Sequence, residues 1–190
     1  MPKGSKNHFE HFLDRSLSHV IRFSGNPQHF HETVGEHSFY VAYFTAILSH
    51  FLKKKGVKID EAKAMKIALV HDMEESFSGD IRGPFKHRSK EVLDAIRKAG
   101  REIIPLVFDD LPADLGKEFV SLWKEDTQQK TIEAQVVKAA DELSLIAKCH
   151  EEAKVGNEFF RPIYERHLEK LRETKHPWWK EINDQILPTS

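Results

Sequence analysis

The segment from residue 61 to residue 72 constrains the fold most, because its apolar residues have helical spacing and cover nearly the whole circumference of the predicted helix. These apolar positions are Ala62, Met65, Ala68 and Leu69 on one face and Ile67 and Val70 on the other. A helix that is hydrophobic nearly all round is buried. The rest of the chain must therefore surround it.

This buried helix ends at His71 and Asp72, where ionisable groups are costly unless they are paired or bound to a metal. Adjacent side chains point about 100° apart around a helix axis, so both reach one ion only if it lies over the helix end. Glu75 follows one turn later, where an acid or base acting on a metal-bound water would lie. Asp80 comes after Gly79, which lets the chain turn back. A His-Asp pair alone arises easily by chance, so its meaning depends on the rest of the chain.

The composition predicts a single all-α domain over residues 1–190. Hydrophobic residues make up 39% of the chain and charged residues 31%, with only nine Gly and eight Pro, which suits helices around a sizeable core. The predicted helices span residues 7–23, 36–55, 61–71, 89 to between 105 and 110, 113–125 and 131–155, with one more helix and a short tail in 159–187. We divide the domain into a metal-site core at about 30–155 and C-terminal helices at 158–187.

Charge and hydropathy exclude several classes of partner. A formal net charge of -1 and a pI near 6.9 leave no basic field for a nucleic acid polymer or an anionic membrane. The longest nearly apolar run, 39–48, is much shorter than the roughly 20 residues that cross a bilayer, and no apolar export signal begins the chain. The one cysteine, Cys149, excludes a disulfide framework and fits a reducing compartment. We therefore expect a cytoplasmic protein.

Two further ligand-type side chains lie on predicted core helices. His37 falls in line with the buried stripe of Tyr40, Val41, Phe44, Ile47, Leu48 and Phe51, so it points at the core. Taken alone, such a histidine is more often a hydrogen-bonded core residue than a ligand. Asp141 lies mid-helix at the edge of the stripe Val136, Val137, Ala140, Leu143 and Ala147. It needs a partner, which is either a cationic side chain or a metal ion.

The cationic side chains of Arg22 and of the loop 81–88 each have a structural and a functional interpretation. Arg22 lies at the end of the first predicted helix, where it could complement the helix dipole. The loop 81–88 carries Arg82, Lys86 and Arg88 around a Gly-Pro pair. It is either a solvated connection or, beside a metal site, a place to collect phosphate oxygens.

Together, His37, His71-Asp72 and Asp141 supply two imidazoles and two carboxylates from three helices, which suits a divalent transition-metal ion with positions open for water. On an all-α chain this order resembles the HD-domain metal-dependent phosphohydrolases, and within them the small (YfbR-like) bacterial 5′-deoxynucleotidases with their archaeal and eukaryotic relatives. The matching segments extend over nearly the whole chain: Arg22, Glu36-His37-Ser38, His71-Asp72-Met73-Glu74-Glu75, Gly79-Asp80-Ile81, Glu133-Ala134, Val137-Lys138-Ala139-Ala140-Asp141 and Gly156-Asn157-Glu158-Phe159.

The resemblance implies an HD-domain helical bundle with additional C-terminal helices and one bound metal ion. Cobalt, manganese or nickel are the first candidates, and zinc or magnesium are further options. The ligands implied are His37, His71, Asp72 and Asp141. Glu75 matches an essential carboxylate beside the metal, Asp80 a second acid near the reacting phosphate, Arg22 a contact to the nucleotide and Lys86 a basic residue of the loop.

The activity implied is a 5′-nucleotidase that converts (deoxy)nucleoside 5′-monophosphates to nucleoside and phosphate, and the family suggests a homodimer. One segment departs from the family pattern. Arg82-Gly83-Pro84 stands where the bacterial nucleotidases have a Pro-Thr-Pro run, so the resemblance does not define substrate choice in that loop.

Two alternatives remain open at this point. Other HD-domain enzymes cleave phosphodiesters or nucleoside polyphosphates, and the two-metal diesterases need extra histidines between the His-Asp pair and the last Asp. That interval contains only His87, which favours one metal. A non-enzymatic helical binding protein with a structural metal is the alternative from another class, but structural sites fill their coordination sphere and favour Cys and His.

Overall fold

The computed structural model describes residues 8–188, and the named elements of this part of the chain are all helices or helical turns. In chain order the elements are α1 (Phe9–Leu13), the 3₁₀ turn η1 (Ser16–His19), α2 (Val34–Lys54), α3 (Glu61–Val70), α4 (Glu75–Ser78), α5 (Gly83–Lys86), α6 (Lys90–Val107), α7 (Ala113–Gln128), α8 (Ile132–Lys154), α9 (Arg161–Arg172), α10 (Pro177–Lys180) and α11 (Asn183–Ile186). Within these residues the only β pairing is an isolated antiparallel bridge between Ile21 and Thr33. The prediction of an all-α fold is confirmed.

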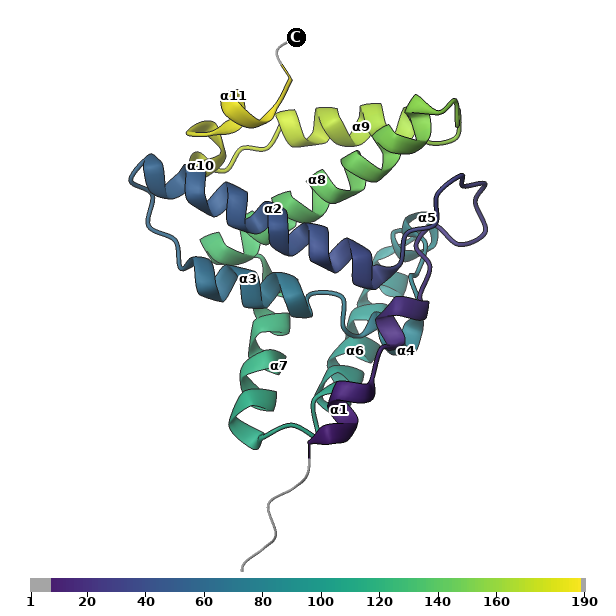
Figure 1. Cartoon of the computed structure of the whole chain (residues 1–190), viewed down its shortest axis with the longest axis vertical. Coiled ribbons are helices and arrows are strands. Elements are labelled where there is room, and N and C mark those ends of the chain that lie inside the picture. Colours follow the sequence, from purple (N-terminus) through teal and green to yellow (C-terminus); the bar gives the residue numbers. More distant parts are fainter. Residues whose placement is uncertain (1–7, 189–190) are drawn as a thin grey trace, which may run out of the picture.

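Helices α2, α3 and α8 form the centre of the molecule. Figure 1 shows α2 and α8 crossing, with α3 beneath them, α6 and α7 on one side and α9–α11 on the other. Ala64, Ile67 and Ala68 of α3 are fully buried, as a helix at the centre requires. Its burial is less complete than predicted, because Leu69 is 55% exposed.

The two long central helices begin at side-chain caps. The Thr33 hydroxyl accepts the backbone N–H of Glu36, and the Glu36 carboxylate accepts the N–H of Thr33, which is a full capping box for α2. Thr131 caps α8 in the simpler way, by accepting the N–H of Ala134. On α2 the predicted buried stripe is wrong at Tyr40, which is 47% exposed.

The predicted helix 7–23 is wrong beyond its first turns; residue 7 lies outside the described part. The chain forms α1 and η1 and is then extended, because its backbone donors have other partners. The Asp14 carboxylate accepts the N–H of Ser16 at 2.8 Å. Further on, Arg22 donates its N–H to the carbonyl of Glu32, and Val20 accepts the N–H of Val34, both at 2.9 Å.

The C-terminal region consists of three helices instead of the one helix and tail that we predicted. Pro177 begins α10, and the following Trp178 and Trp179 are 6% and 0% exposed in the core. The indole of Trp178 donates to the side-chain oxygen of Gln135 on α8 at 3.0 Å. The tryptophans therefore hold the C-terminal helices against α8. No helix of the described chain has the length and apolar character needed to cross a membrane.

Candidate active site

His71 is the residue that ends α3, and its ring is fixed by the backbone of the same helix. Its Nδ1 lies 2.8 Å from the carbonyl oxygen of Ala68, to which it can donate. This bond occupies Nδ1 and leaves Nε2 as the nitrogen available to a ligand. His71 is only 6% exposed, so this nitrogen faces the protein interior.

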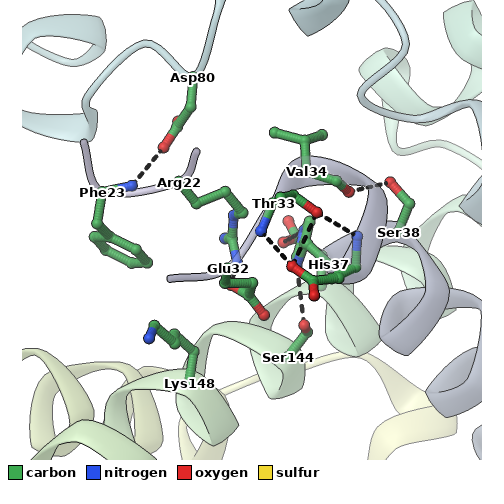
Figure 2. Close-up of polar contacts among 12 residues, drawn as sticks. Arg22, Phe23, Glu32, Thr33, Val34, His37, Ser38, Asp80, Ser144 and Lys148 are labelled. Carbon is green, nitrogen blue, oxygen red and sulfur yellow. Dashed lines mark hydrogen bonds and ion pairs between the residues drawn. The ribbon is translucent and has the colours of Figure 1, made fainter. Parts of the chain in front are cut away.

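His37 reaches the same point from the first turns of α2. It is 1% exposed, and its Nδ1 pairs with the hydroxyl of Ser144 on α8 at 2.9 Å, as Figure 2 shows. Its Nε2 lies 3.2 Å from Oδ1 of Asp141 and 3.6 Å from Oδ2 of Asp72. Among the described residues, the Nε2 atoms of His37 and His71 are buried without a hydrogen-bond partner.

Asp72 and Asp141 give the site its negative charge. Asp72 lies 3.1 Å from Nε2 of His71, and the potential ligand atoms of His37, His71 and Asp72 lie within 4.8 Å of one another. Asp141 uses Oδ2 to accept a bond from Lys138, one turn earlier on α8, at 2.5 Å. The sequence left two possible partners for Asp141, a cationic side chain or a metal ion. The structure provides the cationic side chain, Lys138, on the same helix.

The pKa values of these groups are shifted in different directions: burial is the main cause that lowers the pKa of His37, whereas nearby charges outweigh burial at the other three. Burial lowers the pKa of His71, but the adjacent Asp72 carboxylate outweighs it and raises the pKa to about 10. Burial would raise the pKa values of Asp72 and Asp141, yet His71 and Lys138 respectively hold them below their usual range. Nε2 of His37, Nε2 of His71 and the Asp72 carboxylate lie close enough together to hold one divalent transition metal. The Asp141 carboxylate lies beside this group, 3.2 Å from Nε2 of His37.

Glu75 is the first residue of α4, and Asp80 lies in the loop after this helix. Burial, together with the Asp72 and Asp80 charges, raises the pKa of Glu75 to about 9. Asp80 accepts the backbone N–H of Phe23 at 3.0 Å, which ties its loop to the segment that carries Arg22 (Figure 2).

Arg22 is a nearly buried cation that the Asp141 and Asp72 carboxylates influence. Its residue is 8% exposed, and its Nη1 lies 2.5 Å from Oε2 of Glu32. Burial lowers its pKa, but Glu32, Asp141 and Asp72 together raise it. The guanidinium is therefore charged and electrostatically coupled to the metal-site carboxylates.

A cavity of about 350 Å³ opens beside this cluster, between α4, α6 and α7. Its polar wall includes His71, Asp72, Glu75, Lys86 and Asp141, and its apolar wall includes Leu93, Ile96, Ile103 and Trp123. Lys86 therefore faces the same space as the metal-site residues, whereas Arg22 and Asp80 lie outside its lining. The unusual Gly83-Pro84 pair begins the short helix α5 that ends in Lys86.

Sequence reasoning missed several charged or polar partners around the site. Trp123 of α7 donates its indole N–H to Glu74 at 2.6 Å, and burial raises the pKa of Glu74 to about 7. The contact joins residues 49 positions apart, so no local pattern reveals it. Lys138 could have been found, because its spacing of three from Asp141 pairs the two on one helix face.

Comparison with known proteins gives a consistent result. The family model of the YfbR-like 5′-deoxynucleotidases matches residues 8–190. The 5′-deoxynucleotidase HDDC2 of Dictyostelium discoideum is 33% identical over 159 residues, which cover 82% of each chain. The PH0347 protein of Pyrococcus horikoshii is 27% identical in sequence, with a TM-score of 0.76 over 94% of this chain and 95% of that one.

A phage enzyme shares the fold at lower identity. The HD phosphohydrolase DatZ of cyanophage S-2L, bound to dA and one catalytic Zn²⁺, is 17% identical with a TM-score of 0.65, over 94% of this chain and 93% of that one. The helical arrangement is thus that of the HD phosphohydrolases, as the sequence predicted. With a family model matching nearly its whole length, this chain belongs to the YfbR-like family of 5′-deoxynucleotidases.

Proposed function

We propose that this chain is a metal-dependent phosphomonoesterase that hydrolyses deoxynucleoside 5′-monophosphates to nucleoside and phosphate. The observation that carries the proposal is the pair of buried, unpartnered Nε2 atoms of His37 and His71, which face Asp72 and Asp141 beside a cavity of about 350 Å³. That volume lies in the range of small-ligand sites, roughly 300–1,000 Å³. The names of the family and of its Dictyostelium relative support the substrate class.

The four residues that would hold the metal are His37, His71, Asp72 and Asp141. The family resemblance implies Co²⁺, Mn²⁺ or Ni²⁺, with Zn²⁺ or Mg²⁺ as further options, and a mixed imidazole and carboxylate set is compatible with these ions. When bound, such an ion stabilises charge on phosphoryl oxygens and makes a bound water more acidic. Ser144 and the carbonyl of Ala68 hold the two rings so that Nε2, not Nδ1, is presented.

The remaining residues bind the phosphate and move the proton. Arg22 and Lys86 are the cations that would hold the non-bridging oxygens. Burial and the charges of Asp72 and Asp80 raise the pKa of Glu75, so it keeps a proton more readily than a free glutamate. It would donate this proton to the leaving 5′-oxygen as water adds to phosphorus and the P–O bond breaks. Asp80 positions the Arg22–Phe23 segment through the Phe23 N–H.

The test is phosphate release from a panel of deoxyribo- and ribonucleoside 5′-monophosphates, using metal-stripped protein to which single metals are returned. We expect release only with a transition metal, a preference for the deoxy sugar, and loss of activity in Asp72→Ala. Release from a diester or a nucleoside triphosphate instead would favour the phosphodiesterase or polyphosphate hydrolase alternative. Membership of a hydrolase family favours all of these over a non-enzymatic binding protein.

The partner expected besides the nucleotide is a second copy of the chain. Phe39, Tyr40 and Tyr43 form an exposed aromatic group on α2, with 64%, 47% and 54% of their surfaces exposed. Apolar groups of this kind often mark protein interfaces. Light scattering should give a dimer mass, and Tyr43→Glu should reduce it toward the monomer. A monomeric wild type would contradict the proposal.

A cytoplasmic location stays a prediction. The division of the domain into a metal-site core and C-terminal helices, at residues 155–158, also stays a prediction.

A further inference from the structure

Arg22 is attached at three points to the segment 27–34, which has no role in the reaction proposed above. Its backbone N–H donates to the carbonyl of Glu32, and its own carbonyl accepts a bond from the Gln28 side chain, both at 2.9 Å. Its guanidinium pairs with the Glu32 carboxylate at 2.5 Å. The next residue, Phe23, has a φ of 55°, a rare conformation for an aromatic residue that persists only where surrounding contacts impose it.

The segment is itself fixed to α8 by a buried carboxylate. Glu152 is 0% exposed and accepts the backbone N–H groups of His29 and Phe30 at 2.9–3.1 Å. It also accepts Lys148 at 2.7 Å and the Asn157 amide at 2.8 Å. We call Lys148, Glu152 and Asn157 the α8 clamp.

The clamp also binds two carbonyl groups of the same segment. Asn157 donates to Pro27 at 2.9 Å, and Lys148 donates to Phe30. At its other end the segment enters the capping box of Thr33 and Glu36. Glu32 thus lies between two anchored points and cannot follow Arg22 if the arginine moves (Figure 2).

We infer that Glu32 is a positioning residue, which holds the Arg22 guanidinium in the orientation that binds the substrate phosphate. This inference rests on the proposed function. A guanidinium has five N–H donors, and the pairing with Glu32 uses one of them and leaves the others for an anion. Ordering a long arginine side chain costs conformational entropy, and Glu32 makes that ordering part of folding instead of substrate binding.

Glu32 also keeps Arg22 away from the metal-site carboxylates. Asp141 and Asp72 both attract the guanidinium, as their effect on its pKa shows. Without Glu32, the arginine would be free to pair with these carboxylates, where it would no longer face the phosphate. Loss of Glu32 should therefore weaken substrate binding and raise mainly the KM for the nucleotide.

The experiment is a double-mutant cycle of Glu32→Gln and Arg22→Ala, assayed by phosphate release from dAMP with Co²⁺. We expect Glu32→Gln to raise KM about tenfold, with a smaller change in kcat, as loss of a charged hydrogen bond allows. In the Arg22→Ala background the same change should have no further effect, because Glu32 acts only through Arg22. Glu36→Gln is the matched control, since glutamine preserves the capping box, and it should leave KM unchanged.

An equal tenfold effect of Glu32→Gln in both backgrounds would overturn the inference, as would an unchanged KM. The cycle is repeated as dAMP binding by calorimetry, in Co²⁺-loaded protein that carries Glu75→Gln to prevent turnover. Binding without any hydrolysis by the wild type would refute the proposed function alone, and the binding cycle would still decide the role of Glu32. Neither binding nor hydrolysis would refute both.

Discussion

Two buried polar clusters lie on the same helix, α8, and they differ in how their hydrogen bonds are satisfied. In the α8 clamp the Glu152 carboxylate receives bonds from His29, Phe30, Lys148 and Asn157. About three turns earlier, the cluster around Asp141 leaves the Nε2 atoms of two histidines without a partner.

The difference separates a structural role from a binding role. A buried polar group without a partner is costly, so proteins retain such groups where a ligand completes them. Burial alone would raise the pKa of Glu152. The bonds from His29, Lys148, Phe30 and Asn157 outweigh burial and lower the pKa to about 2. The clamp is complete as it folds, whereas the cluster around Asp141 is one that the proposed metal ion would complete.

The largest expected effect comes from removing a ligand of the incomplete cluster. Asp72→Ala should lower metal-dependent turnover by a factor on the order of 10³ or more, because metal affinity and the orientation of His71 both depend on this carboxylate. Phosphate release and metal content after dialysis measure the two effects. Asp94→Ala, at an exposed position of α6, is the control. Full metal content in Asp72→Ala would show that the cluster is not the metal site.

Glu152→Gln should have the opposite profile: low stability with metal binding retained. The amide would keep one acceptor oxygen, present a donor to either Lys148 or Asn157, and leave the buried ammonium without a counter-charge, which costs about 3 kcal/mol of unfolding free energy. Urea unfolding measures the loss, and Glu151→Gln, at the exposed neighbouring position, is the control. A stable variant that has lost its metal would reverse the assignment of the two clusters.

The sequence predicts the metal cluster better than the clamp, for a physical reason. His37, His71, Asp72 and Asp141 lie at helix positions whose apolar neighbours predict that each side chain faces the core, and the resemblance to the HD-domain family implies that they share one site. The clamp depends on the segment 27–30, whose backbone groups cover Lys148 and Glu152. If this segment is not known, the Lys148–Glu152 pair, spaced i,i+4 on α8, looks like an ordinary ion pair on a solvated surface.

The same limit explains one helix that was predicted wrongly and one buried face that was predicted wrongly. Apolar residues at 9–21 have helical spacing, but the chain is extended after η1 because Val20 and Arg22 bond to residues 34 and 32 instead. On α8, Ala147 was expected inside and is exposed, while Ser144 and Lys148 are buried. A polar residue is buried when a distant segment satisfies it, and local spacing contains no information about that segment.

Ser144→Ala tests whether the clamp-bearing helix also supports the metal cluster. Removing the hydroxyl leaves Nδ1 of His37 without its partner, so the ring loses its preferred orientation. Metal affinity should fall by about tenfold, the lower end for such supporting contacts. Competition with a metal-binding dye measures the change, and Ser121→Ala, at an exposed position of α7, is the control. An unchanged affinity would mean that packing alone orients His37.

The smallest expected effect is on how the free energy of unfolding depends on pH. It should distinguish the α8 clamp from the cluster around Asp141 without a change in activity. The folded-state pKa of Glu152 is about 2 against an ordinary value of 4.5, so its contribution is complete above pH 4.5 and is lost as the pH falls toward 2. Between pH 5 and pH 3 the wild type should therefore lose more stability than Glu152→Gln. The difference corresponds to at most one proton taken up on unfolding. Urea midpoints of the metal-free proteins at each pH measure it. Parallel curves for the two proteins would mean that Glu152 titrates normally, and that the clamp is no more complete than a surface ion pair.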